Sequence, residues 1–452
     1  MTNRDETVDV LVVGGGLAGG LVAEAAARQG KRVVVLERAA EPGGRARSQA
    51  QGEHRFNFGP HAIYRGGPMH RALVAAGVPV TGVDPSVGGA QALFADGRLD
   101  ALPISLGGAL RAGWFGTRDA VDFMRAAQAV KTGPRAQAPL HETSAAAWID
   151  SLATRENART MLAVLVRLAT YGGDLHVLSA DVAQQQLAAA LRSGVIYVHG
   201  GWQALVDGLL ARVKQAGAQV RHARAASLAL GHGDGALQHR VLDAEGRGYR
   251  ARDVVFACAP HVASSLVGEA DAGLAAFART AQPVTMRCVD LGLRDSRDLR
   301  FTLGVDVPFY FSPQRGVRGM APAGAVSVHA ALYLGAEAPG AGVVHQASPG
   351  EPAGMDPAAL LDQAIDRAVP DLGERLLVRR VLPRAVVHHA LPDCTRGGLL
   401  GRPACASPVP GVWYAGDWVG PEGHLADAAA ASALSVARGI AAQGEGRLRF
   451  AS

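Results

Sequence analysis

The first apolar run of the chain ends directly in a group of glycines. Val8 to Val13 is almost continuously apolar and predicts a buried strand. The residues GGGLAG at 14–19 follow at once, and a helix-like run extends from Leu17 to Gln29. Lys31 to Leu36 is a second apolar run of strand length. The order strand, turn, helix, strand predicts an α/β unit with parallel strands.

The spacing of hydrophobic residues then changes twice along the chain. Short apolar runs on both sides of Asp96-Gly97 predict a hairpin. From Ile104 to Ser193 the apolar residues recur at helical spacing, so we expect a helical lobe, interrupted by a proline-containing loop from Thr132 to Leu140. After Gly200-Gly201-Trp202 the α/β pattern returns. There we expect helices over 203–215 and 357–369, strands over 219–222, 226–230, 238–243, 253–257, 283–293, 325–334, 375–391 and 412–417, and a loop over 335–355.

The glycines at 14, 16 and 19 fit the spacing G-x-G-x-x-G. In such a turn the first glycine allows the tight bend, the second lets the backbone approach a pyrophosphate, and the third allows close packing of helix on strand. The unpaired N–H groups of a helix N-terminus favour a phosphate there. Glu37 ends the second strand, where a carboxylate can bind ribose hydroxyls. This combination predicts a dinucleotide-binding unit.

The composition and charge of the chain argue against several other classes of function. The 452 residues carry a net charge of +5, and the basic residues are scattered arginines without a run that would follow nucleic acid. The four cysteines show no metal-binding spacing, so we expect no metal site, no disulfide framework and a cytoplasmic location. The first seven residues do not resemble a signal peptide. The apolar stretch from Leu425 to Ala442 contains Asp427 and Arg438 and predicts a buried helix, not a membrane span.

Six segments in this order resemble the FAD-dependent family of flavin amine oxidases, protoporphyrinogen oxidases and phytoene-desaturase-like enzymes. They are VVGGGLAGG, PGGRARS, FNFGPH, HGGWQAL, DVVFACAP and YAGDWVGPEGHLADAAAAS. The resemblance covers nearly the whole chain. It implies an α/β fold with a discontinuous Rossmann-like FAD-binding domain (1–67, 200–270 and 395–452) and an inserted α+β substrate domain with a helical lobe (68–199 and 271–394).

The resemblance also implies roles for individual residues. Leu425 would present its N–H to the flavin pyrimidine carbonyl, and Ala225 or Ala226 would contact the adenine through the backbone. The implied FAD-binding residues are Gly14, Gly16, Leu17, Ala18, Gly19, Glu37, Arg38, Gly43, Gly44, Arg45, Gly59, Pro60, His61, Ala225, Gly416, Asp417 and Leu425. No second dinucleotide motif is present, so we expect hydride to come from an organic substrate.

The chain departs from the amine oxidases of this family at two positions. Arg287 is the nearest match to a lysine that these enzymes often place near the flavin. His424 stands where they place an aromatic residue. Both departures argue against an amine or amino-acid oxidase. They favour instead an oxidase, dehydrogenase or desaturase that acts on a C–C or C–N bond of an apolar small molecule.

Flavin dehydrogenation also needs a group that accepts a proton, and the ordinary pKa of histidine suits this task. His424 is the first candidate, followed by His389 or His388, which alternate along an extended segment. The electron acceptor would be oxygen or a quinone. Three alternatives remain at this stage: amine or amino-acid oxidation, a flavin-dependent isomerase, and a non-enzymatic escort protein that binds lipidated partners. The sequence allows a homodimer.

Overall fold

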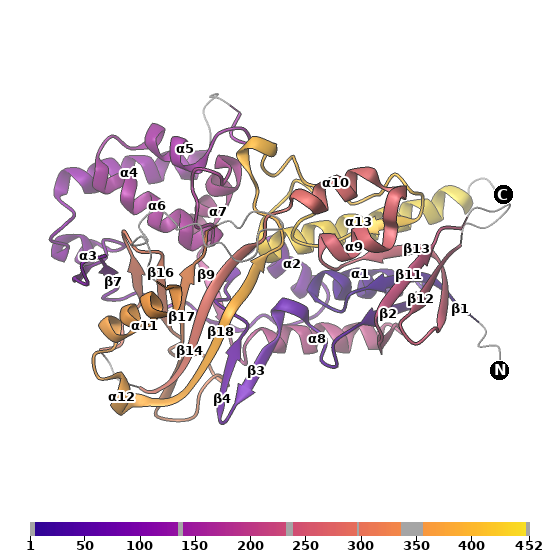
Figure 1. The fold of residues 1–452 in the computed structure, drawn as a ribbon, viewed down its shortest axis with the longest axis horizontal. Coiled ribbons are helices and arrows are strands. Elements are labelled where there is room, and N and C mark those ends of the chain that lie inside the picture. Colours follow the sequence, from indigo (N-terminus) through magenta and orange to yellow (C-terminus); the bar gives the residue numbers. More distant parts are fainter. Residues whose placement is uncertain (1–4, 134–138, 232–237, 296–297, 336–355, 449–452) are drawn as a thin grey trace.

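The computed structural model describes residues 5–133, 139–231, 238–295, 298–335 and 356–448. All but the first residue of the expected loop over 335–355, and residues 134–138 of the one over 132–140, lie outside these residues. Two seven-stranded sheets organise the molecule, and the helical segments cover their faces (Figure 1).

The first sheet is the predicted α/β unit with later strands added to it. Its order is β10-β2-β1-β13-β12-β11, and β19 also pairs with β13. The strands are β1 (Glu6–Val13), β2 (Val33–Glu37), β10 (Gln219–His222), β11 (Ala225–Ala229), β12 (His239–Asp243), β13 (Gly248–Phe256) and β19 (Val412–Tyr414). The strands β10, β2, β1, β13 and β19 run parallel, and the hairpin β11–β12 joins antiparallel to β13.

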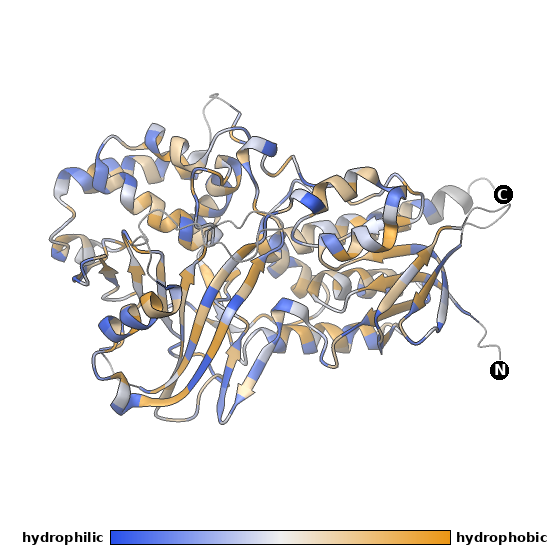
Figure 2. Cartoon of the chain, viewed as in Figure 1, coloured by the Kyte–Doolittle hydropathy of each residue, from blue (hydrophilic) through white to orange (hydrophobic). Residues whose placement is uncertain are grey.

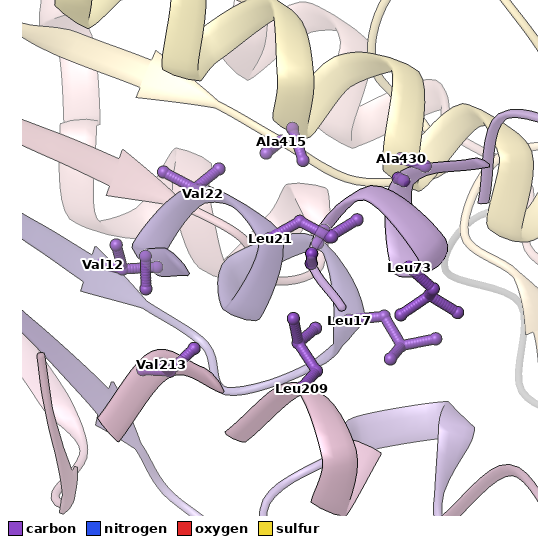
Figure 3. Packing of buried hydrophobic residues seen from close by; sticks show 14 of the residues in the cluster. Val12, Leu17, Leu21, Val22, Leu73, Leu209, Val213, Ala415 and Ala430 are labelled. Carbon is purple, nitrogen blue, oxygen red and sulfur yellow. The ribbon is translucent and has the colours of Figure 1, made fainter. Parts of the chain in front are cut away.

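Both faces of this sheet are buried, which explains the continuous apolar runs of its strands. Val10 and Val12 of β1 pack toward α1 (Leu17–Arg28), α8 (Trp202–Gln215) and α13 (Leu425–Leu448). Figure 3 shows this layer, with residues of β1, α1, α2, α8 and α13 meeting in one core. Leu11 and Val13 point to the opposite face, toward α9 (Pro260–Val267) and α10 (Ala272–Thr280).

The second sheet follows the order β18-β14-β17-β16-β15-β7-β8 and is antiparallel except for the pair β15–β7. Its strands are β7 (Gln91–Leu93), β8 (Leu99–Ala101), β14 (Val284–Arg294), β15 (Thr302–Gly304), β16 (Phe309–Pro313), β17 (Ala325–Tyr333) and β18 (Leu376–His388). Hydrophilic and hydrophobic residues mix along β14 and β18 (Figure 2). The hairpin at Asp96-Gly97 is confirmed as β7–β8, whereas the sequence analysis assigned no strand to β15 or β16.

The helical lobe is confirmed and lies against one face of the second sheet. It consists of α3 (Leu106–Arg111), α4 (Thr117–Thr132), α5 (Ala145–Leu152), α6 (Glu156–Thr170) and α7 (Ala180–Ser193). Met161 and Val164 of α6 share a core with Met286 and Cys288 of β14. The helix α11 (Pro357–Ala368) covers the other face through Leu361 and neighbouring residues.

Smaller elements connect the two sheets. They are the hairpin β3 (Ser48–Gln51) with β4 (His54–Asn57), the sheet of β5 (Ile63–Tyr64), β9 (Val195–Val198) and β6 (Gly82–Val83), and the helices α2 (Pro68–Ala75) and α12 (Leu372–Arg375). Although the predicted boundaries assign α2 and α10 to the substrate domain, both pack in the cores of the first sheet, through Leu73 and Leu274 respectively.

One described helix, α13, is long and apolar enough to cross a membrane, over Leu425–Gln443. Ala430, Ala433, Val436 and Ile440 of this helix are fully buried against the first sheet and its helices. The segment is therefore a core helix of the fold.

Candidate active site

The glycine turn between β1 and α1 has the three properties that its spacing predicts. Gly14 has φ +114°, and a Cβ there would lie 2.4 Å from the carbonyl oxygen of Ala257. A Cβ on Gly19 would lie 2.0 Å from the carbonyl oxygen of Gly14, so only glycine lets α1 approach this closely. At Gly16 the nearest atom to such a Cβ is the Gly43 oxygen at 3.7 Å. The protein thus leaves room beside Gly16, where a pyrophosphate needs it.

The N-terminus of α1 is free to bind an anion. Gly16 precedes the helix and no side chain caps it, so the first-turn N–H groups of Leu17 and Ala18 lack a side-chain acceptor. The loop after β2 folds back onto this turn as predicted, because Gly43 donates from its backbone N to the carbonyl oxygen of Gly15 at 2.9 Å. Gly44 follows Gly43 at the start of a short 3₁₀ turn that leads to Arg45.

Glu37 lies at the carboxyl end of β2, next to the glycine turn. Its carboxylate accepts hydrogen bonds from the backbone N–H of Gly15 (2.7 Å) and of Ala39 (2.8 Å). The side chain of Arg38 is exposed. Ala225 and Ala226 open β11 in the same sheet, Ala225 partly buried and Ala226 exposed. The backbone N of Ala223, two residues before β11, donates to the Glu37 carbonyl oxygen at 2.9 Å, so the segment that leads into β11 adjoins the carboxyl end of β2.

Asp417 is the centre of a charged group that joins three distant segments. Its carboxylate, 1% exposed, accepts from Arg45 Nη1 at 2.6 Å, from the His389 backbone N at 3.0 Å and from His389 Nδ1 at 2.9 Å. Arg45 also donates to the Val387 carbonyl oxygen at 2.8 Å. Burial acts to raise the pKa of Asp417, but the Arg45 guanidinium and the hydrogen bond from the His389 side chain outweigh it and hold that pKa well below its usual range. Asp417 is therefore ionised at neutral pH.

His388 and His424 form a stacked pair beneath this group, with ring centroids 4.5 Å apart. Both are buried, at 0% and 1% exposure. His388 Nε2 donates to the Asp417 carbonyl oxygen (3.1 Å), and its Nδ1 accepts from the Ala390 backbone (3.1 Å). His424 Nε2 donates to the Thr170 carbonyl oxygen (3.1 Å), and its Nδ1 accepts from Arg402 (3.3 Å). Both rings are therefore fully hydrogen-bonded and neutral.

The placement of His424 argues against its expected role as the base. Burial and the nearby Arg402 guanidinium lower the pKa of His424 to about 3, and neither ring nitrogen is free. His388 is equally enclosed, and burial lowers its pKa well below the ordinary value. His424 instead connects the start of α13 to the end of α6, where Leu425 and Tyr171 line a cavity. It is a positioning residue.

This placement gives a prediction for His424→Gln. A glutamine keeps a donor and an acceptor, so we expect the anaerobic rate of flavin reduction by substrate to fall less than about tenfold, since the loss is positional and not that of a general base. We also expect no ionisation of residue 424 in the pH profile of either protein, because the pKa of about 3 lies outside the working range. Loss of an ionisation near neutral pH in the variant would restore His424 as the base.

Asp427 connects the first turn of α13 to α2. Its side chain is 6% exposed, and Oδ1 accepts from the Met69 backbone N at 2.8 Å. Burial disfavours the charged form and raises the pKa of Asp427 to about 6. The folded protein therefore binds this proton more tightly than the unfolded chain, for which the value is 3.8.

We accordingly expect Asp427→Asn to become more stabilising, relative to the natural chain, as pH rises. Ionisation of Asp427 lowers the free energy of unfolding of the natural protein progressively as pH rises from about 4. Above about pH 6 the full loss applies, which is at most about 3 kcal/mol. Asparagine keeps the acceptor for Met69 and carries no charge. The free energy of unfolding of both proteins, measured at about pH 4 and about pH 8, tests this expectation. The same difference at both pH values would refute the raised pKa.

Gly59, Pro60 and His61 lie where the hairpin β3–β4 leads toward the second sheet. His61 Nδ1 donates to the Gly59 carbonyl oxygen at 2.9 Å, and its ring packs edge-on against Trp202 at 4.8 Å. Burial lowers the pKa of His61 to about 4, so the ring is neutral. A Cβ on Gly59 would lie 3.7 Å from Cys288 Sγ. The strand β14 thus turns Cys288, and not the neighbouring Arg287, toward this turn.

A cavity of about 650 Å³ lies between the helical lobe and the second sheet. None of its lining residues, all within the described part of the chain, carries a charge. Aromatic and aliphatic side chains form its walls, and the tyrosine hydroxyls are among its few polar groups. Lining residues include Tyr64, Phe115, Leu165, Tyr171, Tyr197 and Leu425. Leu425 belongs to the first turn of α13, so this cavity extends to the start of that helix, next to the buried His424.

The structure brings Arg45, Asp417, His388, His389 and His424 into one group. It does not place any of the three candidate histidines on the cavity wall. The sequence analysis missed Arg402, which donates to the Gly423 carbonyl oxygen at 2.9 Å and is buried behind the start of α13. It also missed the tyrosines of the cavity. No motif marks these residues, because they come from separate segments that only the fold assembles.

Comparisons with known proteins support the fold. A model of the NAD(P)-binding Rossmann-like domain matches residues 12–76. No curated protein sequence matches the chain. Among solved structures, putrescine oxidase bound to putrescine is 15% identical, with a TM-score of 0.69 over 97% of this chain and 100% of that chain. The chain has the fold of the flavin amine oxidases. The resemblance suggested by the motifs is confirmed at the level of the fold.

Two further structures share this fold. Cyclohexylamine oxidase from Brevibacterium oxydans IH-35A is 15% identical, with a TM-score of 0.66 over 96% of this chain and 99% of that chain. A candidate protoporphyrinogen oxidase from Exiguobacterium sp. 255-15 is 14% identical, with a TM-score of 0.63 over 97% of this chain and 99% of that chain. Because these structures span nearly the whole chain, the two-sheet architecture is common to all of them.

Proposed function

We propose that the chain is an FAD-dependent oxidoreductase acting on a C–C or C–N bond of a largely apolar, uncharged small molecule. The observation that carries the proposal is the uncharged cavity that ends at Leu425, the first residue of α13. A charged substrate would lose its hydration in this cavity without gaining an ion pair, which is costly. An apolar substrate gains from the same burial.

The residues present fit FAD. The space beside Gly16, the uncapped start of α1 and the positive charge of Arg45 suit a pyrophosphate. Glu37 suits the adenosine ribose, and the first turn of α13 suits the polar edge of the ring system. FAD, when bound, would supply the hydride acceptor. The electrons would then leave to oxygen or a quinone.

The chain itself would orient the substrate and exclude water. The aliphatic and aromatic walls hold an apolar molecule, and the hydroxyls of Tyr64, Tyr171 and Tyr197 supply polar contacts. Burial raises the pKa of Tyr64 and of the other two tyrosines, so these hydroxyls stay protonated. The Tyr64 hydroxyl donates to the Ala169 carbonyl oxygen at 3.0 Å, and the Tyr197 hydroxyl pairs with the hydroxyls of Tyr310 and Ser312, so both can accept from a substrate but their protons are already engaged within the protein. The Asp417 group holds the loop of Arg45, the end of β18 and the segment before α13 in one arrangement.

A second candidate function is oxidation of a hydrophobic amine. The tyrosine rings that line the cavity favour it, because an aromatic face attracts a cation. The lack of a carboxylate in the described cavity wall disfavours a free ammonium group there.

Anaerobic titration of the FAD-loaded protein separates these functions. The panel should contain neutral apolar molecules and their amine analogues of equal size, and the flavin absorption band reports reduction. We expect bleaching by neutral members at rates above those of the amines. Reduction by amines alone, with stoichiometric peroxide after oxygen is admitted, would replace the first function by the second. No reduction by any member would favour a binding protein or an isomerase.

A further inference from the structure

Two residues of the cavity wall have an unusual backbone conformation. Tyr171 and Leu425, with φ of +58° and +53°, are the only residues other than glycine with positive φ in the part of the chain that the structure describes. Both line the cavity. The residues that directly precede them are joined, because His424 Nε2 donates to the Thr170 carbonyl oxygen at 3.1 Å. Tyr171 and Leu425 are therefore held together at one end of the cavity.

Tyr171 ends α6 at a position that glycine usually takes. A left-handed residue directly after a helix is most often glycine, because a Cβ strains this conformation. The Tyr171 N–H nevertheless donates to the Arg167 carbonyl oxygen at 2.7 Å and closes the last turn of the helix. Its ring packs against that of Tyr333, with centroids 6.5 Å apart, but a phenylalanine would pack in the same way. Backbone strain of this kind is typical of ligand sites, so the hydroxyl of this strained residue suggests a contact with a ligand.

The Tyr171 hydroxyl differs from the other hydroxyls of the cavity wall. It makes no hydrogen bond to any residue that the structure describes, although the side chain is only 9% exposed. Burial raises the pKa of Tyr171 well above its ordinary value, so the hydroxyl keeps its proton at neutral pH. A buried hydroxyl without a partner is costly, and a ligand in the cavity can supply that partner. The remaining hydroxyls of the wall have partners within the protein; they belong to Tyr64, Ser105, Tyr197 and Tyr310.

We infer that Tyr171 selects the substrate by donating a hydrogen bond to a neutral oxygen atom of an otherwise apolar molecule, such as the carbonyl oxygen of a ketone. The inference rests on the proposed function and narrows its substrate class. A charged oxygen is disfavoured, because none of the described residues that line the cavity carries a charge. A pure hydrocarbon would leave the hydroxyl unpaired.

The position of Tyr171 indicates where this oxygen atom would lie. Tyr171 shares a core with Cys288 of β14, and Cys288 Sγ lies 3.7 Å from the position of a Cβ on Gly59. It also adjoins the first turn of α13 through Leu425. The oxygen atom would therefore lie at the end of the cavity where the proposed function places the flavin, and the apolar remainder of the molecule would extend between the aliphatic and aromatic walls.

Two uncharged probes of nearly equal shape test the inference on the FAD-loaded protein. The ketone probe, 2-acetylnaphthalene, carries a carbonyl group where the hydrocarbon probe, 2-ethylnaphthalene, carries a methylene group. Isothermal titration calorimetry measures the dissociation constant of each probe and needs no turnover. Tyr171→Phe removes the hydroxyl and keeps the ring, so it should weaken binding of the ketone probe about fivefold and leave binding of the hydrocarbon probe unchanged. Comparing the two proteins cancels the different hydration of the probes.

A second variant and a spectrum provide the controls. Tyr64→Phe removes a hydroxyl of the same cavity whose proton is already donated to the Ala169 carbonyl oxygen. It should therefore affect both probes equally. The infrared band of the ketone carbonyl, identified by carbon-13 labelling, should lie at lower wavenumber on the natural protein than in cyclohexane, because a hydrogen bond weakens the C=O bond. The band should return toward its cyclohexane position on Tyr171→Phe. Circular dichroism confirms that each variant is folded.

Two outcomes would overturn the inference alone. Tyr171→Phe could weaken both probes equally or neither, or the carbonyl band on the natural protein could lie where it lies in cyclohexane, which needs no variant. The cavity would still bind neutral apolar molecules in both cases, so the proposed function would stand. If neither probe bound to the natural protein, the inference and the proposed function would both be contradicted.

Discussion

Replacing Gly16 with valine is expected to give a folded protein that retains no FAD. Gly16 has φ −82°, which valine adopts without strain, and a Cβ there would meet no protein atom closer than 3.7 Å. The side chain would therefore fill the space left beside the first turn of α1. A pyrophosphate needs that space to reach the N–H groups of the turn. Absorption spectra after reconstitution with FAD, together with circular dichroism, measure both parts of the expectation.

Two other glycines provide controls for this experiment. Gly19→Val should impair folding itself, because its Cβ would lie 2.0 Å from the Gly14 oxygen. Gly373→Val should fold and bind FAD normally, since Gly373 is exposed and no atom lies within 4 Å of its Cβ position. If Gly16→Val purified with a full complement of FAD, the assignment of the pyrophosphate site would be wrong.

Removal of the Asp417 carboxylate is expected to cost the apoprotein several kcal/mol of folding free energy. Asp417→Ala leaves three donor groups without their acceptor, namely Arg45 Nη1, the His389 ring and the His389 backbone N. Breaking a buried charge pair costs about 3–5 kcal/mol, and the lower end applies here because Arg45 is 35% exposed. Asp417→Asn keeps one oxygen acceptor, so its loss should be smaller.

The pH dependence of the free energy of unfolding gives an independent check on the stabilising role of Asp417. Its folded-state pKa is lowered, so its stabilisation is present above the unfolded value of about 3.9 and is lost as pH falls below it. Denaturant unfolding of the natural protein and of Asp417→Asn should therefore converge as pH falls below about 4. An Asp417→Ala variant that is as stable as the natural protein would show that this group does not hold the three segments together.

Much of the cofactor-binding domain could be predicted because its signals are local. The apolar runs of β1 and β2 enclose the glycine turn, and each glycine has a steric reason that neighbouring atoms confirm. The loop with Gly43 and Gly44 could be placed over the turn because it follows β2 directly. Residue alternation along β1 also fixes which side chains face α1 and which face α9.

The chemistry near the cavity could not be predicted in the same way. A histidine at 424 suggests a base by its ordinary pKa, but burial and Arg402 are tertiary effects that no local pattern reveals. The cavity wall combines residues of β5, β9, α4, α6 and α13, which are far apart in sequence. The domain boundaries also depend on tertiary packing, as the contact of α2 with α13 shows. The residue type identified the candidates for the base, and the burial of each side chain in the structure decided among them.

The central claim is that the glycine turn, the Arg45 loop and the start of α13 together hold one FAD. The absorption spectrum of the purified protein tests it most directly. We expect a yellow protein with a flavin spectrum, or a colourless one that becomes yellow and binds one equivalent of FAD on reconstitution. A folded protein that stays colourless at saturating FAD would contradict it.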